Sequence, residues 1–195
     1  LAGEPPVALL AVWGQPRLGS WLSEILAPAP ARRWRPDPGL ELPVLMGSGT
    51  AGVLLHELIG HLVESDLVLS GDSPLAALCG AAVTAVSIDL ADDPCRGDLP
   101  GAFSCDDEGV AARPVALMKD GVLAGRLHSR RTATEFDEPV TGHCVAEDYR
   151  YAPIIRMGCI FIEPRNQTKD ELLAKLGDGL YLCNHMGGQT TGENF

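Results

Sequence analysis

The spacing of apolar residues predicts a long helix in the first half of the chain. From Ala51 to about Asp66, apolar side chains recur at helical intervals, and they are Leu54, Leu55, Leu58, Ile59 and Leu62. Leu42–Met46 precedes this segment as a predicted strand, Gly47-Ser48-Gly49 as a turn, and Thr50 stands at the position of the helix N-cap. We expect this helix to be buried.

Strand-like patterns follow the predicted helix. Apolar residues alternate in Ala82–Leu90, and Ile154–Ile162 is an apolar run between two prolines. Asp120-Gly121 is typical of a two-residue hairpin turn, and it separates Val115–Lys119 from Val122–Leu127. Leu180–Leu182 is the last predicted strand. These patterns predict a β-rich body around the helix.

The two ends of the chain carry shorter patterns. Thr168 and Glu171 form a capping box before a helix that Gly177 ends. Near the N-terminus, residues 7–13 have strand length, and Ser20 can cap a helix that stops at Pro28. A Pro-rich linker occupies 28–39, so we expect an N-terminal segment of residues 1–40 and a core of residues 41–195.

Composition narrows the classes of function. The 195 residues carry a formal net charge of -11, which disfavours nucleic-acid binding because phosphate contacts need clustered Lys and Arg. The basic segment Arg126–Arg131 is short, and we interpret it as a solvated face. No apolar run reaches the ~20 residues of a membrane-spanning helix. With 22 Gly and 15 Pro the chain contains many turns, which favours β structure over a helix bundle.

The six cysteines include no Cys-x-x-Cys pair, and the first residues do not resemble a signal peptide. We therefore expect a reduced, cytoplasmic protein with neither nucleic acid nor membrane as a partner.

Two histidines on the predicted helix are candidates for metal ligands. His56 and His61 are five positions apart, with Glu57 after the first, whereas zinc peptidases commonly place them four apart. On a regular helix, residues five apart differ by roughly 140° around the axis. A π-type turn inserts one residue and is frequent at functional sites. We hypothesise that Gly60 permits such a turn and returns His61 to the face of His56.

These residue types suit a zinc-dependent hydrolase. Neutral imidazoles of His56 and His61 would bind Zn²⁺, and Glu57 would act as general base toward metal-bound water. The alternative is a buried helix with two incidental histidines, but an unpaired Glu57 would be costly on an apolar helix.

Several segments resemble the TldD/PmbA family, also called the modulator of DNA gyrase family. The similarity covers roughly Leu42 to Phe195, in order. The matching segments are the HExxxH block of 52–61 continuing to Glu64 and Asp66, Asp106-Asp107-Glu108-Gly109, Asp120-Gly121-Val122-Leu123, Thr141-Gly142, Pro153-Ile154-Ile155-Arg156-Met157, Gly179-Leu180-Tyr181 and Gly187-Gly188-Gln189.

The resemblance implies a zinc-dependent peptidase that acts on peptides or unfolded polypeptide segments and takes part in peptide maturation. It also implies an α+β fold with a mostly antiparallel β-sheet body, in which the buried helix carries the HExxxH motif. Family members form homodimers or pair with an inactive sister subunit that usually lacks the histidines, so this chain is placed on the active side. An extended substrate would dock by strand pairing.

The family's third zinc ligand, a cysteine in a Gly-rich segment, matches no residue of this sequence. Cys183 with His185, and His143 with Cys144, are the alternatives that remain. Glu64 could be a ligand, although we favour a role as hydrogen-bond partner of a ligating histidine.

Two interpretations of function therefore stay open. One is an active zinc peptidase, and the other is a truncated, catalytically inactive member that binds peptides or supports a dimer partner. Of the remaining polar residues, Asp66 and Asp106-Asp107-Glu108 are expected to form turns or caps. His128, at the polar end of the hairpin, is expected to be exposed.

Overall fold

The structure is a computed structural model, and it describes residues 34–97 and 99–185. The chain divides into two compact units, Leu1–Glu41 and Leu42–Phe195. The predicted strand at 7–13, the helix that begins at Ser20 and the first part of the linker lie outside the described residues. Within the described residues, no helix combines the length and apolar character needed to cross a membrane.

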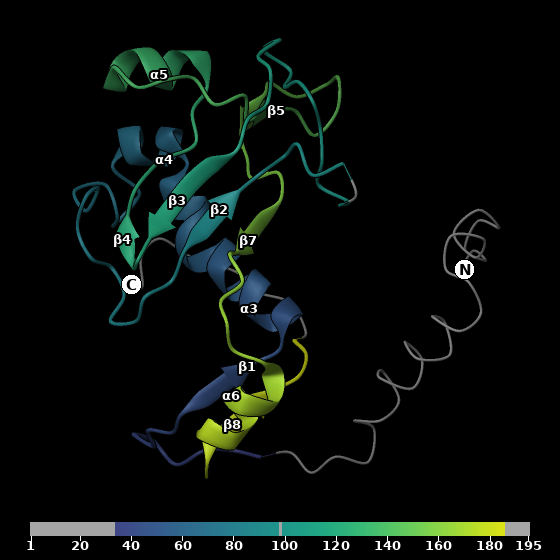
Figure 1. Cartoon of the computed structure of the whole chain (residues 1–195). Helices are drawn as coiled ribbons and strands as arrows, with labels where there is room; N and C mark the ends of the chain where they lie inside the picture. Colours follow the sequence, from purple (N-terminus) through teal and green to yellow (C-terminus); the bar gives the residue numbers. More distant parts are fainter. Residues whose placement is uncertain (1–33, 98, 186–195) are drawn as a thin grey trace, which may run out of the picture. The chain divides into compact units, whose positions relative to one another are not determined.

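The second unit combines helices with short strands, as expected for an α+β fold, and its largest sheet is antiparallel (Figure 1). This sheet has four strands in the order β4-β3-β2-β7. They are β2 (Leu90–Asp92), β3 (Val115–Lys119), β4 (Val122–Leu123) and β7 (Ile160–Ile162).

The predicted hairpin joins β3 to β4. Asp120 and Gly121 have φ angles of 54° and 80°, the left-handed pair that a tight hairpin turn requires. Strand β4 ends at Leu123, four residues short of the predicted end. Leu127 instead donates its amide to Val63 O at 3.0 Å, so the chain leaves the sheet to pair with the helical segment.

Two predicted strands are wrong in extent. Of Ala82–Leu90, only Leu90 belongs to a strand, and Ala82 forms an isolated antiparallel bridge to Val122 of β4. The residues between bond to the hairpin turn, where the Val83 amide donates to Gly121 O at 2.9 Å. The predicted strand of residues 154–162 is two strands in different sheets, β6 (Ile154–Ile155) and β7. Strand β6 pairs antiparallel with β5 (Cys144–Val145).

A separate parallel pair joins the beginning and the end of the second unit. Strand β1 (Val44–Met46) pairs with β8 (Leu180–Leu182) in parallel register, while the other two sheets of the described residues are antiparallel, as the resemblance implied. Helix α6 (Lys169–Leu176) precedes β8, and its capping box and C-terminal Gly177 are as predicted.

The predicted helix of residues 51–66 is a composite. Helix α3 (Ser48–Leu55) continues into a π-helical turn, η1 (His56–Gly60), and then a 3-10 turn, η2 (His61–Val63). Glu64 is extended, and α4 (Ser65–Ser70) begins after it. Helix α3 contains no buried residue, so burial is confined to the later turns.

The predicted N-cap at Thr50 is also wrong. The cap is Gly47, which donates its amide to Leu182 O of β8 at 2.8 Å, so pairing with β8 places the start of the helix earlier. Helix α5 (Arg130–Phe136) had no counterpart in the prediction, and Ser129 and Thr132 form its capping box.

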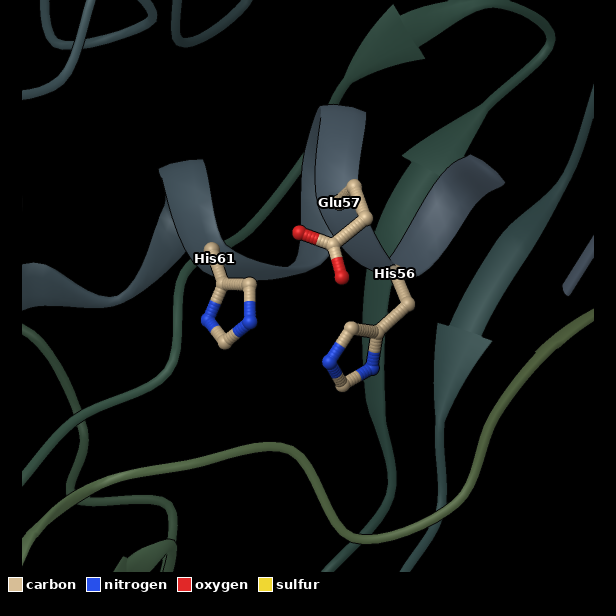
Figure 2. A group of neighbouring side chains, drawn as sticks. All are labelled: His56, Glu57 and His61. Atoms are coloured by element: carbon tan, nitrogen blue, oxygen red, sulfur yellow. The ribbon is translucent and has the colours of Figure 1, made fainter. Parts of the chain in front are cut away.

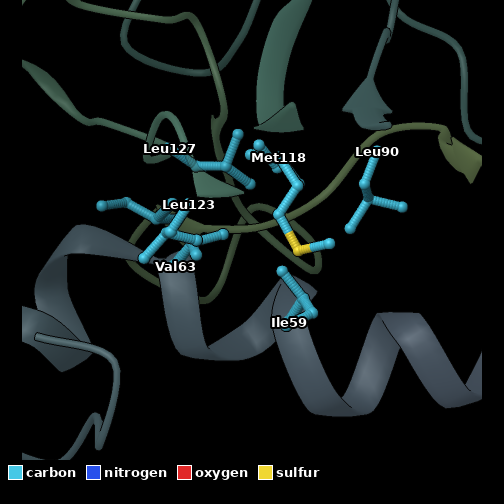
Figure 3. Close-up of a cluster of buried hydrophobic side chains, with 8 residues drawn as sticks. Ile59, Val63, Leu90, Met118, Leu123 and Leu127 are labelled. Atoms are coloured by element: carbon cyan, nitrogen blue, oxygen red, sulfur yellow. The ribbon is translucent and has the colours of Figure 1, made fainter. Parts of the chain in front are cut away.

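The core lies between the sheet and the composite helix, which contributes Ile59 and Val63 (Figure 3). The other buried members come from the strands and the segments beside them, and they are Leu90, Leu117, Met118, Leu123, Leu127 and Ile155. One face of the η1 turn is therefore anchored in the core, while the opposite face is left for polar side chains.

Candidate metal centre

The η1 turn brings His56 and His61 together (Figure 2). The His61 amide donates to His56 O, five residues back, which is the π-type turn that the spacing predicts. The ring centroids are 4.6 Å apart and the ring planes make an angle of 82°. One ligand atom of each of His56, Glu57 and His61 lies within 4.8 Å of the others.

Gly60 permits this turn for a reason of packing. Its backbone angles are those of an ordinary right-handed helix. A Cβ at this position would overlap the Met157 sulfur and lie 3.2 Å from Ile160 Cδ1. The absent side chain thus lets the segment of residues 157–160 pack directly against the turn that carries the histidines.

Glu64 holds the ring of His61. The carboxylate is fully buried, and its Oε1 accepts a hydrogen bond from His61 Nδ1 at 3.0 Å. Oε2 accepts from Arg156 Nη1 at 2.7 Å. With Nδ1 committed to Glu64, the Nε2 atom of His61 is left for a ligand. This is the hydrogen-bonding role that we favoured for Glu64 over metal ligation.

The two imidazoles have different electrostatic surroundings. Burial and the neighbouring His61 lower the pKa of His56, so its ring is neutral near pH 7 and can donate a lone pair. The hydrogen bond to Glu64 raises the pKa of His61. Burial raises the pKa of Glu64 itself, although His61 and Arg156 act in the opposite direction. A cation at this site therefore competes with a proton mainly at His61.

This donor set fits a zinc ion. Zinc prefers imidazole nitrogen and carboxylate oxygen among the available donors, and catalytic sites pair such ligands with an open position. Two imidazoles at half-buried positions, with a carboxylate beside them, meet the first requirement. The hydrogen bond from His61 to Glu64 is a further point of fit, since ligating histidines usually donate their other ring N–H to a carboxylate.

The other candidate ligands lie elsewhere. Among the described residues, the group that could hold a metal consists of His56, Glu57 and His61. His143 is fully buried and bonds to Thr141 O and Asp92 Oδ1 at 3.0 and 3.2 Å. Burial raises the pKa of the Cys144 thiol to about 12, which disfavours the thiolate that a metal needs.

Cys183 and His185, the other alternative pair, also stand apart from the histidine group. Cys183 is exposed at the end of β8, and its thiol is 4.0 Å from Tyr181 O.

His128 is buried, so the prediction that it is exposed is wrong. Only 1% of its surface is accessible, and its Nε2 lies 2.9 Å from Glu138 Oε2. Its Nδ1 lies 3.1 Å from Thr132 Oγ1. The unpredicted helix α5 folds over this residue and provides Thr132. Arg126 also pairs with Glu138 and stacks on Phe136, so the basic segment is partly structural rather than wholly solvated.

The acidic residues near 106 form turns, as expected. Asp106 accepts hydrogen bonds from the amides of Glu108, Val110 and Cys144. Asp107 accepts from the Ala146 amide at 2.7 Å.

Sequence reasoning missed two residues that support the site. In the sequence, Arg156 is only part of a segment that resembles the family, and no pattern along the chain indicates its contact with Glu64. Asp92 carried no signal at all. It is fully buried, and its Oδ1 accepts from the amides of Gly158 and Cys159 at 3.0 and 3.3 Å.

Comparison with known proteins gives consistent matches over the second unit. Residues 39–194 match the family model described as the PmbA/TldA metallopeptidase C-terminal domain. A "Metalloprotease" of Archaeoglobus fulgidus is 39% identical over 78% of this chain and 35% of its own length. A "Zinc metalloprotease TldD homolog" of Saccharolobus solfataricus is 30% identical over 77% of this chain and 34% of its own length.

A solved structure supports the fold. The crystal structure of TldE from Thermococcus kodakarensis superposes with a TM-score of 0.68 at 20% identity, over 78% of this chain and 35% of that chain. The chain thus spans about a third of the length of the curated relatives that it matches.

Proposed function

We propose that the chain hydrolyses peptide bonds at a zinc centre held by His56 and His61. The chain belongs to the PmbA/TldA metallopeptidase family, which supports this reaction. The observation that carries the proposal is the convergence of ligand atoms from His56, Glu57 and His61 within 4.8 Å on a π-type turn. A regular helix would separate the two rings, so this distortion favours a shared ligand over incidental placement.

Each side chain has a role that follows from its position. His56 and His61 provide neutral nitrogen donors, and Glu64 fixes His61 so that Nε2 is the donor atom. A bound Zn²⁺ supplies Lewis acidity, which lowers the pKa of a water ligand toward ~7 and polarises a carbonyl. Glu57 follows His56 directly, and its carboxylate accepts the proton of the attacking water and delivers it to the leaving amine.

The substrate, partners and location belong to the same proposal. The substrate is a peptide or an unfolded polypeptide segment, docked in extended form by strand pairing. The protein acts in the cytoplasm as a homodimer or beside a sister subunit, and the fold shared with TldE is compatible with such pairing. Residues 41–195 form the metallopeptidase core, and residues 1–40 a separate segment.

The test uses the purified chain of 195 residues, elemental analysis and an unstructured peptide as substrate. We expect about one zinc per chain. Glu57→Gln should retain zinc and slow hydrolysis by ~10²- to 10⁴-fold, the usual contribution of a general base. A Glu57→Gln protein that cleaves as fast as the original chain would refute the role assigned to Glu57.

A second candidate is an inactive member that binds peptides or supports a dimer partner. This candidate is favoured because the proposed centre has two histidine ligands, whereas catalytic zinc sites generally use three protein ligands. It predicts little zinc and no hydrolysis of peptides of any length, while peptide binding or dimer formation is retained.

A further inference from the structure

Glu64 connects the candidate metal centre to a distant part of the chain. Its side chain is fully buried, yet both carboxylate oxygens have partners. Oε1 accepts from His61 Nδ1 at 3.0 Å, and Oε2 accepts from Arg156 Nη1 at 2.7 Å. A buried carboxylate needs such a counter-charge, because desolvation of a lone ion costs several kcal/mol. Arg156, 92 positions from Glu64, provides it.

Arg156 is itself held from both sides. Its backbone amide donates to His143 O at 2.9 Å, and its Nη1 also donates to Ile155 O at 2.9 Å. Two residues later the Gly158 amide is bound to Asp92 Oδ1 at 3.0 Å. These contacts reduce the conformations open to the guanidinium, so it can hold Glu64 in one orientation.

The segment that carries Arg156 also packs on the η1 turn. Met157 fills the space that a side chain at Gly60 would occupy. In Figure 2 a ribbon in the yellow-green that Figure 1 gives to this part of the chain passes below the two imidazole rings. The side chain of Met157 thus contacts the turn that carries the histidines.

We propose that Arg156 is a positioning residue of the metal centre: by holding Glu64 Oε2 it keeps Glu64 Oε1 on His61 Nδ1, which leaves His61 Nε2 as the donor to the metal. This inference rests on the proposed function for its metal, but the arrangement of the His61 ring can be measured without one. Arg suits the role better than Lys, since the planar guanidinium fixes the directions of the two hydrogen bonds that Nη1 donates to Glu64 and to Ile155 O.

A competing role for Arg156 is direct contact with the substrate, because 44% of its side chain is exposed. The two roles differ in what the side chain changes. A positioning residue alters the ring of His61 and the affinity for metal, whereas a substrate contact alters only the Michaelis constant or the rate.

The first experiment measures ring-nitrogen chemical shifts of His61 in the metal-free, ¹⁵N-labelled full chain at one alkaline pH, above the raised pKa of His61, so that the two neutral tautomers are compared. In the original chain His61 should be present mainly with its proton on Nδ1. Arg156→Met should shift the ratio of the two tautomers several-fold toward Nε2–H. Arg150→Met is the matched control, because Arg150 pairs with Asp148 at the surface at 2.5 Å. An unchanged ratio in Arg156→Met would overturn the inference.

The second experiment measures zinc affinity by chelator competition. Arg156→Met should weaken zinc binding ~10- to 100-fold, the usual effect of losing an outer hydrogen-bond partner. Glu64→Gln should have a similar effect, and the double variant should lose little more, since both act through one contact. Arg156→Lys should lose less zinc affinity than Arg156→Met. If Arg156→Met does not fold, the zinc affinity of Arg156→Lys is compared with that of the original chain instead. Effects of the two single changes that multiply in the double variant would contradict a shared route through Glu64.

The outcomes separate this inference from the proposed function. A chain that binds no zinc refutes the proposed function, while the tautomer ratio still decides the role of Arg156. A zinc-binding chain in which Arg156→Met keeps its zinc affinity but raises the Michaelis constant assigns Arg156 to the substrate and overturns the positioning role.

Discussion

The histidines at the η1 turn and the two buried histidines use their ring nitrogens in opposite ways. His143 has both nitrogens bonded, to Thr141 O and Asp92, and His128 has both near Thr132 and Glu138. By contrast, His61 bonds through Nδ1 alone. The ring of His56 packs against that of His61 with no hydrogen-bond partner among the described residues.

This difference separates structural from chemical histidines. A buried imidazole must satisfy both nitrogens because each unmet polar atom costs about 1–3 kcal/mol. A half-buried imidazole can leave one nitrogen open to water or to a ligand. Burial and complete hydrogen bonding therefore indicate a structural role for His128 and His143, and the open nitrogens of His56 and His61 are the ones that the proposed zinc centre would use.

The largest expected effect comes from removing one histidine of the open pair, by which we mean His56 and His61. His56→Ala should reduce bound zinc from about one equivalent per chain to a trace and abolish peptide hydrolysis, because one imidazole cannot hold the ion. The free energy of unfolding of the metal-free chain should change little, since His56 is only half-buried. Elemental analysis and denaturant titration of the same sample check both statements, and retained zinc would contradict them.

The next effect comes from removing His143, one of the two buried histidines with both ring nitrogens bonded. His143→Ala should lower the free energy of unfolding by about 3–5 kcal/mol, because it leaves the buried Asp92 carboxylate without its imidazole partner. Denaturant titration of the metal-free chain measures the loss. Under conditions where the variant is folded, it should still bind one zinc. Loss of zinc from the folded variant would place His143 in the site after all.

A smaller effect concerns the close packing below the open pair. Gly60→Ala should destabilise the chain by about 1–3 kcal/mol, as expected for overpacking against Met157 and Ile160. Gly52→Ala in α3 is the control, because nothing lies within 4 Å of its Cβ position, and it should be neutral or stabilising. The double variant Gly60→Ala/Met157→Ala tests the mechanism. Because Met157→Ala removes the overlap, Gly60→Ala should destabilise the Met157→Ala chain less than it destabilises the original chain.

The smallest effect is a pH dependence of the free energy of unfolding that arises from the buried His128. Burial lowers the pKa of His128 from 6.5, although Glu138 opposes this. The unfolded chain therefore takes up a proton below pH 6.5 before the folded chain does, and stability falls as the pH drops from 6.5 to the folded pKa. The slope from one group is at most ~1.4 kcal/mol per pH unit.

His128→Gln should flatten this part of the stability profile, measured by denaturant titration at several pH values. Glu138 adds a loss at lower pH. Burial raises the pKa of Glu138, but Arg126 and His128 lower this pKa by more than burial raises it, so the net pKa lies below 4.5. A slope between pH 6.5 and about 5 that survives His128→Gln would assign the dependence to other groups.

Local features were predicted well because their causes lie within a few residues. The Asp120-Gly121 turn requires left-handed angles that these residues tolerate, and the Thr168 capping box closes within one turn. The π-type turn followed from the spacing of His56 and His61 and from Gly60, on the premise that both rings serve one ion. Each depends on neighbours along the chain, which the sequence shows directly.

Boundaries and burial were predicted poorly because distant contacts decide them. Helix α3 begins at Ser48 because Gly47 bonds to β8, and the predicted strand of residues 154–162 divides because Asp92 binds the amides between its two halves. His128 is buried because helix α5 covers it, although its own neighbours in the sequence are polar.

By itself, the sequence determined which residues could form a metal centre, since the spacing of His56, Glu57 and His61 admits convergence only through one extra residue in the turn. Only the tertiary structure decided how that centre is supported. Arg156 reaches Glu64 across 92 positions, and no pattern along the chain reports such a contact. Hydrogen bonds and desolvation depend on distances in space, and those become defined only when the whole unit has folded.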